Sequence, residues 1–78
     1  MKSLRKIVGE ILDIEPNKLN MNSSANDVPT WDSVNNLIII SEVEKEYKVK
    51  ITISEVYKLK NLGDFFNLLK QKGTKINF

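Results

Sequence analysis

The sequence contains no cysteine and no histidine among its 78 residues. Without cysteine the chain has no disulfide, no thiolate nucleophile and no cysteine-based metal site, which fits a reducing compartment. Without histidine it lacks the base of a Ser-His-Asp or Cys-His catalytic device and the usual ligands of zinc. The chain therefore lacks the side chains that these catalytic devices require.

Long hydrophobic runs are also absent. The longest unbroken apolar run is Leu37–Ile40, far short of the roughly 20 residues that a membrane-spanning helix needs. Residues Met1–Leu4 are followed by charged side chains, Arg5, Lys6, Glu10 and Asp13, and not by the apolar core of a signal peptide. We therefore expect a cytoplasmic protein without a membrane partner.

Size and composition favour one small domain over residues 1–78. The hydrophobic fraction of 41% is ordinary for a globular domain and argues against wholesale disorder. The net charge of +2 is unevenly spread, since residues 31–57 are acidic and residues 58–78 are basic. Nucleic-acid binding requires a denser basic surface, so we expect the last lysines to form a solvated face.

The first third of the chain predicts a helix and then a long loop. Ser3 can cap a helix whose apolar residues recur at the spacing of one buried face, and Pro16 ends it near residues 13–15. Gly9 lies inside this helix at a cost of about 1 kcal/mol relative to alanine, which close packing against a neighbour would explain. Residues 16–32 have turn chemistry, and four apolar side chains are candidates to pin this loop to the core: Leu19, Met21, Ala25 and Val28.

The second predicted helix runs from Ser33 to Tyr47. Steps of 100° per residue place Asn36, Ile40, Val43 and Tyr47 on one side, flanked by Leu37 and Ile39. The opposite side, which we expect to face water, carries Val34, Ile38, Ser41, Glu42 and Lys45.

The remainder predicts an extended connector and two more helices. Val49 and Ile51 alternate with lysines but have no partner strand, and Thr52–Glu55 has the form of a capping box that starts a short helix to about Leu59. Asn61 can cap a last helix that Gly73 ends, and residues 74–78 are expected to be a loose tail. The predicted fold is all-α, a small four-helix bundle of three longer helices and one short helix. Its predicted core is Leu4, Ile7, Val8, Ile11, Leu37, Ile40, Val43, Tyr47, Phe65, Phe66 and Leu69.

The segment Trp31–Val34 joins the loop to the second helix. Asp32 and Ser33 are both strong N-cap residues, and the positive end of a helix macrodipole beside Ser33 suits a group that carries phosphate. We expect Trp31 to pack onto the bundle. From local sequence alone, Ser33 is interpreted as an ordinary cap; a modified serine is the alternative.

The whole pattern resembles the acyl carrier protein family over about residues 3–72. The resemblance rests on Ile14–Leu19 after the first helix, on Asp32–Ser33–Val34 at the start of the second, on Val43–Ile51 and on Asn61–Phe65. It implies that Ser33 carries 4′-phosphopantetheine through a phosphodiester, and that the thiol of this arm holds an acyl or aminoacyl group as a thioester. Asp32 is the motif neighbour of this serine.

The resemblance also implies that the protein is not itself an enzyme, and it implies the partners. These are a phosphopantetheinyl transferase and the enzymes that load and transfer the acyl or aminoacyl group, with the carrier as a monomer. The second helix departs from the acidic pattern of fatty-acid carriers, because its early positions include Asn35, Asn36, Ile38 and Ser41, and acid begins at Glu42. We therefore expect a dedicated biosynthetic pathway, with partner contacts through Val34, Ile38, Ser41, Glu42 and Lys45. The alternative is a small helical protein-interaction or nucleic-acid-binding domain without a prosthetic group.

Overall fold

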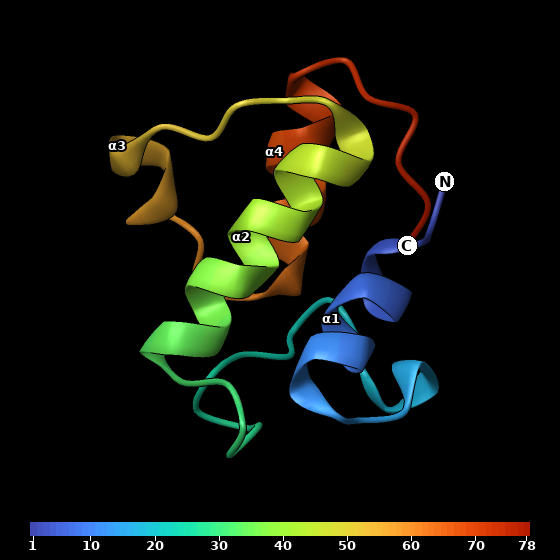
Figure 1. The fold of residues 1–78 in the computed structure, drawn as a ribbon, viewed down its shortest axis with the longest axis vertical. Coiled ribbons are helices and arrows are strands. Elements are labelled where there is room, and N and C mark those ends of the chain that lie inside the picture. The colour runs from blue at the N-terminus through green and yellow to red at the C-terminus, as the bar shows by residue number, and fades with distance from the viewer.

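A computed structural model describes all residues 1–78 and contains four α-helices and no strand, which confirms the predicted fold class. Helix α2 crosses the middle of the molecule with α4 behind it, and α3 stands apart at one side (Figure 1). None of these helices is both long and apolar enough to cross a membrane. The elements in chain order are α1 (Leu4–Leu12), a 3₁₀ turn (Pro16–Lys18), α2 (Ser33–Tyr47), α3 (Ile53–Val56) and α4 (Leu62–Gln71).

Side-chain caps fix where the three longer helices begin. The Ser3 side chain accepts from the Lys6 N–H of α1, and the Asn61 side chain accepts from the Asp64 N–H of α4. At the start of α2 the cap is Asp32, whose Oδ1 accepts from the Asn35 N–H at 2.8 Å. Because the carboxylate satisfies this free N–H, Ser33 is left as the first residue of the helix.

The core lies between α1, α2 and α4, and its residues differ in part from the predicted core residues. Leu37 is 65% exposed, so its assignment to the core was wrong, whereas Ile39 is fully buried. Ile11 and Phe66 are only partly buried against the core. Ile39 and Leu37 flank the Ile40–Val43 stripe on opposite sides, and the core takes up the Ile39 side. The buried hydrophobic residues are Leu4, Ile7, Val8, Leu12, Leu19, Val28, Trp31, Ile39, Ile40, Val43, Tyr47, Leu62, Phe65 and Leu69.

Two of the four expected anchors hold the long loop in place. Leu19 and Val28 are buried as predicted, but Met21 and Ala25 are exposed and the prediction was wrong for them. Met21 instead holds the loop through its backbone, because its carbonyl accepts a hydrogen bond from the Gly63 N–H at 2.8 Å. The Ser23 carbonyl likewise accepts from the Leu62 N–H at 3.0 Å. These two bonds join the loop to the first turn of α4 and so place it beside the start of α2.

Gly9 is packed tightly, as its position in a helix suggested. A Cβ atom at this residue would lie 2.6 Å from the backbone oxygen of Ile14 and 3.3 Å from Cγ of Pro16. The backbone turns back on the helix here, with Asp13 in the left-handed region at φ 56° and the Ile14 N–H bonded to the Gly9 carbonyl.

We predict that Gly9→Ala destabilises the protein. Alanine gains about 1 kcal/mol of helix propensity, but relieving an overpacked contact with backbone costs about 1–3 kcal/mol, so a net loss of up to about 2 kcal/mol is expected. Urea unfolding followed by circular dichroism measures it, with the exposed α1 variant Lys6→Ala as the control. A Gly9→Ala protein more stable than wild type would show that the turn after α1 moves freely.

The capping box of α3 is present with both of its bonds. The Thr52 side chain accepts from the Glu55 N–H, and the Glu55 carboxylate accepts from the Thr52 N–H at 2.9 Å. The hydrogen bond from the Thr52 N–H lowers the pKa of the Glu55 carboxyl, and the Lys72 ammonium, 3.0 Å from Oε1 of Glu55, lowers it further. The helix ends at Val56, before the predicted boundary near Leu59.

Residues 74–78, expected to be a loose tail, lie against α1. The Asn77 and Phe78 carbonyls accept from the Leu4 and Arg5 N–H groups at 2.8 and 3.2 Å. The Phe78 and Phe66 rings pack edge to face with their centroids 5.8 Å apart, and the Arg5 guanidinium lies 4.8 Å from the centroid of the Phe78 ring. The tail thus satisfies free N–H groups in the first turn of α1, and the two ends of the chain lie side by side (Figure 1).

Candidate functional site

Ser33 is held at a fixed position with a free hydroxyl. The turn before it is fixed by the Asp32 cap and by the Asn35 side-chain NH₂, which donates to the Thr30 carbonyl at 2.8 Å. Ser33 itself is exposed, and its Oγ takes part in no hydrogen bond within the protein. The hydroxyl is therefore available to another molecule at the positive end of α2.

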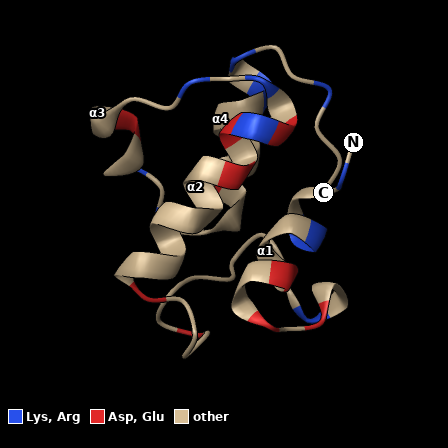
Figure 2. Cartoon of the chain, in the orientation of Figure 1, with Lys and Arg blue, Asp and Glu red and all other residues tan.

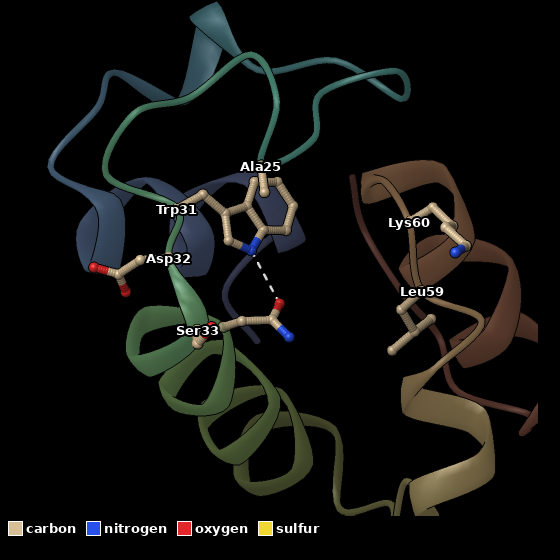
Figure 3. Close-up of a pocket in the computed structure, with 7 residues that line it drawn as sticks. Ala25, Trp31, Asp32, Ser33, Leu59 and Lys60 are labelled. Atoms are coloured by element: carbon tan, nitrogen blue, oxygen red, sulfur yellow. Dashed lines mark hydrogen bonds between the residues drawn. The ribbon is translucent and has the colours of Figure 1, made fainter.

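An open cleft of about 370 Å³ adjoins Ser33. One wall comes from the end of the long loop and the start of α2, and the other from the segment between α3 and α4. Figure 3 shows Leu59 and Lys60 across the cleft from Ser33 and Trp31, with the Asp32 carboxylate turned away from them. The lining residues are Ala25, Trp31, Asp32, Ser33, Asn36, Leu59 and Lys60.

Trp31 forms part of both the core and the cleft. Only 6% of the residue is exposed, which confirms that it packs onto the bundle. Its indole Nε1–H donates to Oδ1 of Asn36 at 2.9 Å, the dashed line in Figure 3. This bond gives a hydrogen-bond partner to the side-chain amide of Asn36, which lies on the otherwise buried face of α2.

The site offers the Ser33 hydroxyl no hydrogen-bonded base. An active serine needs an adjacent base, and the nearest carboxylate, Asp32, is used as a helix cap. The helix start beside the hydroxyl stabilises negative charge. The Lys60 ammonium, on the opposite wall of the cleft, forms none of the three ion pairs in the structure.

The predicted partner-contact residues all lie exposed along α2. Val34 is 67% exposed and Ile38 is 42% exposed; Glu42 and Lys45 pair at 3.6 Å. The first half of α2 carries no charged side chain, and its charges begin toward the far end (Figure 2). Ser41 is exposed as well.

Sequence reasoning missed four residues of this region. Leu37 was assigned to the core but is exposed, and Asn36, Leu59 and Lys60 were not connected with the site. For Asn36 a signal existed, because a polar residue on a predicted buried face requires a hydrogen-bond partner. Leu59 and Lys60 carry no such signal, since only the tertiary fold brings them opposite Ser33.

Comparison with known proteins supports a carrier function. Residues 2–69 match the model of a family described as phosphopantetheine attachment site. The fold is similar to the solution structure of a holo acyl carrier protein from Geobacter metallireducens. The TM-score is 0.81 at 36% sequence identity, over 88% of this chain and 79% of that one.

Fold, site and family match together define a carrier protein, a class that presents a prosthetic group to enzymes and is not itself catalytic. The chain belongs to the phosphopantetheine attachment family, and its prosthetic group is covalently bound 4′-phosphopantetheine. The residues present fit this group. The exposed, unbonded hydroxyl of Ser33 lies at a helix start suited to phosphate, beside an open cleft.

Proposed function

We propose that Ser33 is the attachment residue and that the protein carries an acyl or aminoacyl group. The observation that carries this proposal is the free Ser33 hydroxyl at the first position of α2, next to the cleft. The other five serines are placed differently. Ser3 is a helix cap, and Ser23 is buried and accepts from the Asn20 N–H. The hydroxyls of Ser24 and Ser54 are hydrogen-bonded to Asp27 and Thr52, and Ser41 lies in the second half of α2, away from its start.

The protein's own residues hold and orient the group. When bound, 4′-phosphopantetheine supplies a thiol that holds the cargo as a thioester. Asp32 fixes the first turn of α2 and so the backbone position from which Ser33 presents its hydroxyl. The helix start stabilises the negative charge of the phosphodiester. A phosphopantetheinyl transferase is required, since the chain offers the serine no base.

We further propose that this carrier serves a dedicated pathway instead of general fatty-acid synthesis. The support is the side of α2 next to Ser33, where Val34, Leu37 and Ile38 are exposed. We call these three residues the apolar strip. Ile53 of α3 and Tyr57, the residue after this helix, are also exposed apolar side chains. Partner enzymes are expected to contact the strip and then Ser41, Glu42 and Lys45.

The attachment is tested by incubation with coenzyme A and a broad-specificity phosphopantetheinyl transferase, followed by intact-mass measurement. Wild type is expected to gain the mass of one phosphopantetheine group, and Ser33→Ala none, while both fold alike by circular dichroism. Ser54→Ala is the control, because it removes an exposed serine outside the proposed contact surface and should be modified like wild type. Modification of Ser33→Ala would place the attachment elsewhere, and an unmodified wild type would favour the interaction-domain alternative.

A further inference from the structure

One side-chain amide in the cleft has an unused donor. Asn36 lines the cleft beside Ser33, and its Oδ1 accepts from the Trp31 indole N–H at 2.9 Å. The Asn36 NH₂ makes no hydrogen bond within the protein. Since the structure has no buried side-chain nitrogen or oxygen without a partner, this NH₂ reaches solvent.

Trp31 also sets which way the amide points. An indole nitrogen can only donate, so its partner atom must be the oxygen of Asn36 and not the nitrogen. The indole is itself fixed, because Trp31 is 6% exposed and belongs to the core cluster. The Trp31–Asn36 pair therefore holds a donor in one orientation on the wall of the cleft.

We propose that Asn36, oriented by Trp31, is a positioning residue for the prosthetic group, and that its NH₂ donates to the phosphodiester end of the arm. Ser33 and Asn36 are three residues apart on α2, a separation at which helical side chains are neighbours. The phosphodiester is the part of the arm closest to Ser33 and is rich in acceptor oxygens. Lys60 supplies an unpaired cation on the opposite wall. This inference rests on Ser33 being the attachment residue.

The experiment is NMR of ¹⁵N-labelled apo and holo protein, with modification confirmed by mass. The side-chain NH₂ resonances of Asn36 are expected to shift when the arm is attached, and those of Asn35, which donates to Thr30, to shift less. In Trp31→Phe the ring remains but the N–H that orients the amide is lost. The Asn36 shift is then expected to be largely lost, although the holo form still appears.

A second variant covers the case in which Trp31→Phe does not fold. Asn36→Asp keeps an acceptor for the indole but replaces the donor with a carboxylate, so the ³¹P resonance of the holo protein should move from its wild-type position. Asn67→Asp, the same change at an exposed residue of α4 that does not line the cleft, should move it less.

The possible negative results separate the positioning role of Asn36 from the attachment at Ser33. Unshifted Asn36 resonances in a wild-type holo protein, or equal ³¹P positions in Asn36→Asp and wild type, would overturn the positioning role and leave Ser33 in place. Failure of wild type to form any holo protein would overturn the attachment itself.

Discussion

Ile39→Ala is expected to lower the free energy of unfolding by about 2–5 kcal/mol, the usual cost of truncating a large buried aliphatic side chain. Ile39 is fully buried, in the core between α1, α2 and α4. A domain of this length has a total stability of about 4–12 kcal/mol. The variant should therefore be partly unfolded, or unfold at a much lower urea concentration, as measured by circular dichroism.

Leu37→Ala is the matched control for this prediction. It lies two residues earlier on the same helix and loses a side chain of the same size, but Leu37 is 65% exposed. Surface substitutions of this kind usually change stability by no more than about 0.5 kcal/mol. Equal destabilisation by the two variants would show that α2 is rotated relative to the structure, with Leu37 in the core as the sequence suggested.

Leu37→Glu is expected to slow modification by the phosphopantetheinyl transferase without unfolding the protein. Leu37 lies one helical turn beyond Ser33 in the apolar strip. Loss of an apolar contact at an interface hot spot costs about 1–2 kcal/mol, which corresponds to a fall of roughly 5- to 30-fold in kcat/KM. The rate is followed by mass spectrometry, and folding is checked by urea unfolding.

The control must separate the loss of an apolar contact from the gain of a charge. Leu37→Gln removes the apolar contact without adding a charge, so its kcat/KM should fall about as far as that of Leu37→Glu. The wild-type rate should also depend weakly on salt, because electrostatic steering is what salt screens. A normal rate for Leu37→Glu, with strong inhibition of wild type by salt, would show that charges on α2 direct recognition instead.

Local sequence was sufficient for the starts of the helices and for the place of Ser33 at one of them. Hydrogen bonds of a few residues' span decide where a helix starts, so the caps at Ser3, Asp32 and Asn61 were readable from residue type. Pro16 and Gly73 marked helix ends for reasons that lie in their own backbone. The position of Ser33 at the start of α2 followed from the same local rules.

The rotation of α2 was decided only by the tertiary structure. Apolar residues occupy nearly every side of this helix between Val34 and Val43, so periodicity could not choose between Leu37 and Ile39 as the core flank. The choice depends on where α1 and α4 pack. The same packing leaves Leu37 exposed and so creates the apolar strip.

The cleft beside Ser33 was likewise invisible in the sequence. Its walls are joined by hydrogen bonds between the long loop and α4, from Leu62 to Ser23 and from Gly63 to Met21. These pairs are backbone groups and carry no residue signature. The sequence by itself therefore determined that the chain is a small helical bundle with a serine at the start of its second helix. Only long-range packing decided what faces that serine, because such contacts depend on how elements far apart in the chain meet.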